Sequence, residues 1–335
     1  MRYFKKISSE ITYVFILCLV FLILNSFISK PLNAQEIKNL ENGLRIIVKE
    51  DHRNPLVVFS AFVDVGSANE GAYLGSGISH LIEHMLFKGT KKYPSGNIEE
   101  ILHIYGGKIE AWTSYDYTGF TITILRENKN IALDVLKELL TAPLFNANEL
   151  KKEKQVIERE FDLTKDDPGR RVSRLTFSKA YIRHPYRIPI IGYKENFKRL
   201  ERNDVSNFFN SNYTPEKIVI AAVGDIDAAE VIGEIENLFG NLPRRNNSSL
   251  SLPVEPEQIA YNYIEERADI DGAYLNIAFH STSMLDKGLY AMDLLSFILG
   301  QGESSILNKE IRLKKELVLS ITAYNYTPRD PGLFV

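Results

Sequence analysis

The most informative stretch of the sequence is Ser79-His80-Leu81-Ile82-Glu83-His84-Met85-Leu86-Phe87. Apolar residues recur at helical spacing across positions 78–88, which predicts a helix. His80, Glu83 and His84 then share one face, because positions i, i+3 and i+4 lie together on a helix. Two imidazoles that can bind one cation, with a carboxylate beside them, indicate a metal site with an adjacent acid–base group.

Zinc suits this pattern of nitrogen ligands, and a catalytic zinc site keeps one coordination position open for water. Bound zinc lowers the pKa of that water towards ~7, and an adjacent carboxylate can take its proton. The order H-x-x-E-H is the inverted form of H-E-x-x-H, a signature of zinc peptidases. The remaining histidines are predicted to be surface or packing residues rather than ligands: His52, His103, His184 and His280.

The two histidines need a third protein ligand, and a long charged helix predicted at residues 147–165 is the natural source. It offers four glutamates: Glu149, Glu153, Glu158 and Glu160. Glu153 and Glu160 share a face, because seven residues make nearly two helical turns, and Glu158 lies off that face. Spacing alone leaves the choice of the third ligand open.

Strands and helices surround the motif. Strands are predicted at residues 43–48, 56–63 and 218–223, with two more inside 111–125, and further helices at 98–105, 131–140 and 228–239. A proline-bounded, polar stretch around 246–256 reads as a linker. Beyond it, Ile321-Thr-Ala-Tyr-Asn-Tyr-Thr327 matches Trp112-Thr-Ser-Tyr-Asp-Tyr-Thr118 at four of seven positions. The repeat predicts two homologous αβ domains, 38–245 with the metal motif and 257–335 incomplete at its C-terminus.

Residues 1–34 have the parts of a secretory signal: basic residues at the start, an uncharged apolar run over 11–29, and Ala34 before a cut at Gln35. An uncleaved membrane anchor is the alternative, because this run approaches the ~20 residues needed to span a bilayer. Either reading predicts a secreted or periplasmic protein that touches the membrane only through its leader. The single cysteine, Cys18, lies in that leader and provides no metal ligand or nucleophile to the mature part.

The composition fits a globular chain. It has 335 residues, 44% of them hydrophobic and 25% charged, which excludes collagen, disorder and a small disulfide-stapled fold. The net charge is −3 and there are no basic runs, so no binding to nucleic acid is expected.

A known family shares these motifs. H-x-x-E-H followed by Phe87-Lys88-Gly89-Thr90, then Gly106-Gly107, Ala111-Trp112-Thr113-Ser114 and the segment 153–160, resembles the pitrilysin/insulinase family of zinc peptidases. Mitochondrial processing peptidase and bacterial processing proteases belong to it. His184-Pro185-Tyr186 and Val223-Gly224-Asp225 also fit, so the resemblance runs from about residue 38 to the end. It implies an α+β fold of duplicated domains, each with an antiparallel-rich sheet flanked by helices.

The resemblance also implies roles for individual residues. His80, His84 and Glu160 would bind Zn²⁺, and Glu153 would orient a ligand histidine. An extended peptide would add as a strand to a sheet edge near 111–114. The substrate-binding residues implied are Glu110, Ala111, Trp112, Thr113 and Arg312.

Two positions depart from the family. Glu110 stands where the family usually has an asparagine that holds the substrate backbone. Arg312 fits an arginine that helps to bind the scissile carbonyl, but Leu319 stands where a tyrosine usually accompanies it, and leucine cannot donate a hydrogen bond. This pattern favours a heterodimer with a homologous partner chain that supplies the arginine–tyrosine pair. The alternative to a partner chain is that Tyr324 or Tyr326 takes the place of the missing tyrosine.

The sequence therefore predicts a zinc metalloendopeptidase that hydrolyses peptides or unfolded protein segments outside the cytosol. Glu83 would be the general base toward zinc-bound water and then the acid toward the leaving amine. The alternative is a zinc-bearing subunit or binding and assembly component with little activity in the absence of its partner.

Overall fold

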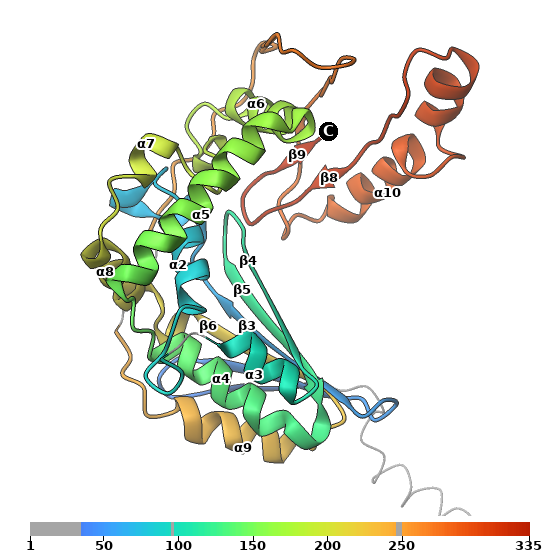
Figure 1. The fold of residues 1–335 in the computed structure, drawn as a ribbon. Coiled ribbons are helices and arrows are strands. Elements are labelled where there is room, and N and C mark those ends of the chain that lie inside the picture. The colour runs from blue at the N-terminus through green and yellow to red at the C-terminus, as the bar shows by residue number, and fades with distance from the viewer. Residues whose placement is uncertain (1–34, 95–96, 246–249) are drawn as a thin grey trace, which may run out of the picture.

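The computed structural model describes residues 35–94, 97–245 and 250–335, and its main body is a six-stranded sheet with helices packed on it (Figure 1). The strands are β1 (Glu36–Asn39), β2 (Arg45–Glu50), β3 (Leu56–Val63), β4 (Lys108–Thr113), β5 (Thr118–Leu125) and β6 (Ile218–Gly224). They are ordered β1-β2-β6-β3-β5-β4, and only the β2–β6 pair is parallel. β4 is therefore an edge strand, with one side free of a neighbouring strand.

One face of this sheet is buried and the other is only partly covered. Burial alternates along β3, β5 and β6, as expected where successive side chains point to opposite faces. Phe59, Ile122 and Ile220 are fully buried on the core face, whereas Ser60 and Thr121 hydrogen-bond to each other on the other face at 2.8 Å. The sequence predicts a strand at 56–63 from its β-branched and aromatic residues and one at 218–223 from a continuous apolar run, and both segments lie in this sheet.

Helices supply the rest of the core. They are α2 (Ile78–Leu86), α3 (Ile98–Ile104), α4 (Lys129–Thr141), α5 (Ala147–Asp166), α6 (Pro168–Ala180), α7 (Lys194–Phe197), α8 (Arg202–Asn212) and α9 (Ala228–Phe239). α4 packs on β5 and β3, α9 on β2, and α2 on β4, α5 and α8. Buried residues of α2, α4, α8 and α9 belong to one hydrophobic cluster with the buried face of the sheet. The predicted α+β class, a mainly antiparallel sheet flanked by helices, is confirmed.

The start of α2 is fixed by tight local contacts. Gly77 precedes the helix in the left-handed region, at φ +70°, and a Cβ there would lie 2.1 Å from the carbonyl oxygen of Ile191. The buried carboxylate of Glu70 accepts the N–H of Ser79 at 3.0 Å and of Gly77 at 3.3 Å. Burial raises the pKa of Glu70 to about 8, and its side-chain oxygens satisfy amides that the start of the helix leaves free. The helix that carries the metal motif thus has a defined beginning.

The C-terminal part contains a three-stranded sheet, ordered β7-β9-β8, and one long helix. Its elements are β7 (Phe279–His280), α10 (Leu289–Gly300), a π-helix (Asn308–Lys314), β8 (Asn325–Tyr326) and β9 (Leu333–Phe334). In Figure 1, β8 and β9 lie beside the tip of the β4–β5 hairpin, while α10, in red, stands apart from the main body.

The internal repeat has a partial counterpart here. The offset that aligns residues 112–118 with 321–327 also aligns α2 with the start of α10. The same offset aligns β4 with residues 317–322, but these residues form no strand. The division into a domain 38–245, a linker and a second domain 257–335 stays a prediction.

The predicted leader, residues 1–34, lies outside the described residues. Within those that are described, no helix has the length and apolarity to cross a membrane.

Candidate metal centre

Three side chains from two helices converge on one point. The Nε2 atoms of His80 and His84 on α2 each lie 3.7 Å from a carboxylate oxygen of Glu160 on α5. One ligand atom from each of the three residues lies within 4.8 Å of the others, and no other such group of metal-binding side chains occurs among the described residues. The donor set of two imidazoles and one carboxylate is one that zinc favours.

The packing of α5 against α2 selects among the four glutamates that spacing left open. Glu160 faces both histidines, while Glu153, nearly two turns earlier on the same face, reaches only the far side of His84. Ile157 between them is buried against the core. Glu149 instead pairs with Lys152 at 2.7 Å. Glu158 lies outside the cluster.

The far side of His84 is held by a charged pair. Its Nδ1 atom lies 3.2 Å from Oε2 of Glu153, whose other oxygen is 3.0 Å from Nζ of Lys88. Burial is the largest single influence and opposes the charged form of each partner. For His84 it is outweighed by the bond to Glu153 together with the charges of Glu160 and Glu83, and for Glu153 by the bonds and charges of His84 and Lys88 together. The pKa of His84 is therefore raised and that of Glu153 is lowered. A carboxylate on the second ring nitrogen fixes the ring and leaves Nε2 free to bind metal.

His80 is neutral in this setting. Burial, with a smaller contribution from the nearby His84, lowers its pKa to about 3. Neutral imidazole is the form that binds a metal. The buried Nδ1 of His80 has no hydrogen-bond partner within the described part of the chain, in contrast to that of His84. The second ring nitrogen of His80 is thus unsupported.

Glu83 lies on the same face of α2 but makes a different contact. Its Oε2 accepts a 2.6 Å hydrogen bond from the hydroxyl of Thr113 at the end of β4. Burial raises the pKa of Glu83, while the Thr113 bond opposes that rise. A carboxylate with a raised pKa beside a metal cluster is suited to accept and return a proton.

A cavity of about 550 Å³ opens beside the cluster. Its lining comes from α2, the end of β4, the C-terminal half of α5, the start of α6 and the segment after α6: His80, Glu83, Ala111, Trp112, Thr113, Glu160, Leu163, Thr164, Arg170, Ile190 and Ile191. The edge strand β4 thus runs along the cavity. A β-edge next to a reactive group is a known arrangement for holding an extended peptide.

The other residues predicted to bind substrate are placed less centrally. Glu110 is exposed, pairs with Lys108 at 3.2 Å and does not line the cavity. Trp112 lines it but also packs edge-to-face on Phe62, with ring centroids 6.0 Å apart. Arg312 lies on the π-helix, 3.5 Å from Oδ1 of Asn308, and is not among the lining residues.

The candidate replacements for the missing tyrosine are also outside the lining. Leu319 is 97% exposed. Tyr324 is partly exposed, and Tyr326 packs in an aromatic cluster with Tyr115 and Phe177. The arginine–tyrosine contribution is therefore missing from the cavity within the described residues.

Several lining and supporting residues were not singled out from sequence. Lys88, which pairs with Glu153, lies one turn beyond His84 and could have been found by helical spacing. Arg170 lies at the start of α6, and Ile190 and Ile191 lie in the irregular segment after that helix; only the packing of these segments brings the three residues to the cavity.

A two-histidine, one-carboxylate cluster beside a half-buried glutamate, a cavity and a free strand edge together define a metallopeptidase type of site. Comparison with known families agrees with this class. Residues 45–194 match the model of insulinase (peptidase family M16), and residues 199–335 match that of the peptidase M16 inactive domain. The chain belongs to the M16 family, and the resemblance inferred from its motifs is confirmed.

Its relatives carry zinc-protease names. The chain is similar to the uncharacterized zinc protease YmxG of Bacillus subtilis, with 29% identity covering 88% of this chain and 70% of that protein. It is also similar to a probable mitochondrial-processing peptidase subunit beta of Arabidopsis thaliana, with 28% identity covering 92% and 60%. A crystal structure of a protease from Helicobacter pylori matches with a TM-score of 0.81 and 26% identity, covering 90% of this chain and 74% of that one.

Proposed function

We propose that this protein is a zinc metalloendopeptidase that hydrolyses peptides or unfolded protein segments outside the cytosol. The observation that carries the proposal is the convergence of His80, His84 and Glu160 beside Glu83, at the mouth of a cavity bordered by an edge strand. Relatives named as zinc proteases support the same activity.

The residues present fit a zinc ion. His80 and His84 would bind through Nε2 and Glu160 through its carboxylate, with Glu153 keeping His84 oriented. Bound zinc would polarise the scissile carbonyl and make water acidic enough to be deprotonated near neutral pH. The unpartnered Nδ1 of His80 does not prevent binding, because a neutral imidazole needs only one nitrogen for the metal.

The chain's own residues would then position substrate and move the proton. An extended peptide would pair with the free edge of β4 at Ala111–Thr113, which places its backbone over Glu83. Glu83 would take a proton from the attacking water on its carboxylate and deliver it to the leaving amine. Thr113 would hold Oε2 of Glu83 in place during this exchange.

Action outside the cytosol rests on the predicted leader and on relatives by fold. Solved structures similar in fold include the periplasmic protease PqqL of Escherichia coli, at 22% identity and a TM-score of 0.69. The absence of cysteine after residue 18 is compatible with an oxidising compartment.

A second candidate is a zinc-bearing subunit that needs a homologous partner. It is favoured by the full exposure of Leu319 and by the position of Arg312 outside the cavity lining. The similarity to mitochondrial-processing peptidase beta subunits points the same way. Under this candidate, the metal motif is complete but a donor to the scissile carbonyl comes from another chain.

The test is hydrolysis of casein or of an unstructured fluorogenic peptide by the purified protein. We expect cleavage that stops when a chelator removes zinc and returns when one equivalent of Zn²⁺ is added back. Cleavage that persists in the metal-free protein would contradict the proposal. Zinc binding without cleavage, followed by cleavage once a homologous partner is added, would favour the second candidate.

A further inference from the structure

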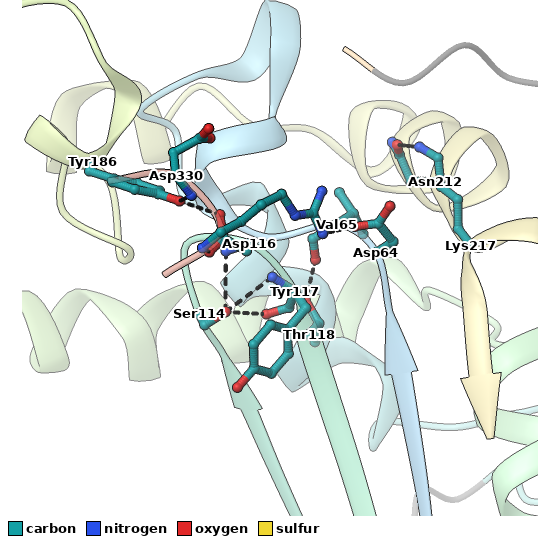
Figure 2. Close-up of polar contacts among 11 residues, drawn as sticks. Asp64, Val65, Ser114, Asp116, Tyr117, Thr118, Tyr186, Asn212, Lys217 and Asp330 are labelled. Carbon is teal, nitrogen blue, oxygen red and sulfur yellow. Dashed lines mark hydrogen bonds and ion pairs between the residues drawn. The ribbon is translucent and has the colours of Figure 1, made fainter. Parts of the chain in front are cut away.

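The tip of the β4–β5 hairpin is held from two sides. On one side, the amides of Ser67 and Ala68 donate to the carbonyl oxygens of Ser114 and Tyr115 at 3.0 and 2.9 Å. Within the turn, the hydroxyl of Ser114 accepts the amide of Tyr117 at 3.0 Å (Figure 2). The hairpin is thereby tied to the segment that leads into the metal-binding helix.

On the other side, the hairpin meets a segment from the C-terminal part of the chain, residues 326–332, which we call the strap. The contact centres on Asp116, only 7% exposed, whose two carboxylate oxygens are both occupied. One accepts the hydroxyl of Tyr186 at 2.7 Å and the other accepts the backbone amide of Arg329 at 2.9 Å. The amide of Asp330 donates to the hydroxyl oxygen of Tyr186 at 3.2 Å, which closes the network.

Apolar contacts surround this carboxylate. Tyr115 packs with Tyr186 and Tyr326, at ring-centroid distances of 5.0 and 6.3 Å, and Leu333 of β9 is fully buried in the same cluster. The hydroxyl of Tyr181 donates to the carbonyl oxygen of Pro331 at 3.0 Å. Burial strengthens the hydrogen bonds of a charged group and makes their loss costly.

The same strap carries a second, exposed contact. The guanidinium of Arg329 pairs with Asp64, and both side chains are nearly half exposed. An exposed ion pair contributes little to stability, because solvent screens it and two side chains must be ordered. The strap therefore offers a buried and an exposed polar contact that can be removed separately.

The hairpin tip is close in sequence to the working end of β4. Asp116 follows Thr113, the donor to Glu83, by three residues, and Ala111 and Trp112 of the same strand line the cavity. β4 pairs with β5 on one side only, so its position depends on how its two ends are fixed. A loose tip would leave both the peptide-binding edge and the Thr113 hydroxyl poorly placed.

We propose that Asp116 is a positioning residue, which docks the strap on the tip of the β4–β5 hairpin and so holds the edge of β4 and Thr113 in their working positions. This inference rests on the proposed peptidase function for its catalytic consequence. The docking itself does not depend on it. The C-terminal part would in this way set the geometry of the β4 edge, which belongs to the six-stranded sheet.

The experiment compares Asp116→Ala and Asp116→Asn with wild type in the full chain. We expect hydrogen exchange at the amides of 326–332 and 108–117 to rise about tenfold or more in Asp116→Ala, since two bonds to a buried charge are lost. The KM for an unstructured peptide should rise about tenfold, with a smaller change in kcat, because a poorly placed edge strand weakens productive binding. Asp116→Asn, which keeps one acceptor oxygen, should give intermediate values.

Arg329→Ala and Asp64→Ala are the matched controls, since they remove the exposed ion pair but leave the amide of residue 329 free to donate to Asp116. Both should keep wild-type exchange and KM. Should Asp116→Ala fail to fold, Tyr186→Phe removes one of the two bonds to Asp116 and also the bond from the amide of Asp330, and it should raise exchange in the same two segments while the bond from the amide of Arg329 to Asp116 remains. Zinc content should stay at one equivalent in every folded variant.

Three results would overturn the inference: unchanged exchange in Asp116→Ala, exchange raised in the strap alone with β4 and KM unchanged, or an equal effect of Arg329→Ala. The exchange measurement also separates this inference from the proposed function. If wild type cleaves no peptide while Asp116→Ala loosens both the strap and β4, the positioning role stands and the peptidase proposal fails.

Discussion

The contact between Glu153 and His84 is the main residue-scale feature behind the candidate metal site. Its carboxylate is nearly buried, yet it stays charged because it bonds Nδ1 of His84 and Nζ of Lys88. The consequence for His84 is a fixed ring with Nε2 directed at Glu160. The second ring nitrogen of the other histidine, His80, has no such partner among the described residues.

We predict that Glu153→Ala weakens zinc binding by about 10–100-fold, the usual effect of losing a carboxylate behind a ligand histidine. The measurement is competition with a chromogenic chelator at fixed pH. Glu149→Ala, one turn earlier on the same helix, is the control and should bind zinc as wild type does, because Glu149 pairs with Lys152. Equal affinity in the two variants would show that Glu153 does not orient His84.

At the residue scale, helical spacing in the sequence predicted one part of the candidate site and left another part open. The i, i+3, i+4 pattern placed His80, Glu83 and His84 on one helical face, and they lie there. It left four glutamates open as the third member, because the rotation of α5 about its axis depends on the burial of Leu150 and Ile157 against the core. Asp116 could not be found in advance, because its partners lie 70 and 213 residues away.

At the scale of elements, strong periodicity gave nearly correct bounds. The strand at 56–63 and the helix at 228–239 were predicted with the bounds observed for β3 and α9. β1, α6 and α8 were missed: β1 has only four residues, and α6 and α8 have low apolar content. α6 is stabilised by packing on α5 and by Asp167, whose side chain accepts the amide of Arg170 at 3.0 Å. Such tertiary and capping contacts leave little periodic signal.

The side chain of Glu255 contacts the backbone of residues 182–184, and we expect the stability that this contact contributes to depend on pH. Its carboxylate accepts three consecutive amides, those of Ile182, Arg183 and His184, at 2.6, 2.9 and 2.7 Å. Burial raises the pKa of Glu255, but these hydrogen bonds outweigh burial and lower it overall. A pKa that is lower in the folded state gives stability above the unfolded pKa, and this stability is lost as the pH falls through the folded value.

We therefore predict that Glu255→Gln lowers the free energy of unfolding by about 1–2 kcal/mol at neutral pH. The difference from wild type should shrink in acid, since the native carboxylate is then protonated as well. Urea unfolding at about pH 7 and about pH 3 measures both values. A difference of equal size at the two pH values would exclude a charged carboxylate as its source.

At the scale of the whole molecule, the six-stranded sheet with its helices and the C-terminal part differ in how well they are packed. The first has a continuous buried core, whereas many large apolar side chains of the second are exposed, among them Tyr290, Leu294 and Phe297 on α10. Arg312 and Leu319 belong to this second part and contribute nothing to the cavity lining. The repeat in the sequence hinted at two related halves, but it could not show which residues reach the site.

The proposed dependence on a partner follows from that arrangement. Losing one donor to the transition state typically costs ~10²–10³ in turnover. We expect the chain alone to cleave peptides slowly and to recover on addition of a homologue that supplies an arginine–tyrosine pair. Titrating such a homologue into a fluorogenic assay measures the effect. Full activity from the single chain, unchanged in Leu319→Tyr, would contradict it.

The most direct test of the peptidase mechanism is the Glu83→Gln variant, assayed for zinc content and for peptide hydrolysis on the same preparation. In the proposed mechanism Glu83 transfers protons, and it is not part of the three-residue metal cluster. We predict that zinc stays at one equivalent, as in wild type, while hydrolysis falls to background. Glu158→Gln, on α5 but outside the cluster, should match wild type in both measurements. Loss of zinc from Glu83→Gln, or hydrolysis at the wild-type rate, would contradict the role of Glu83 as the general base.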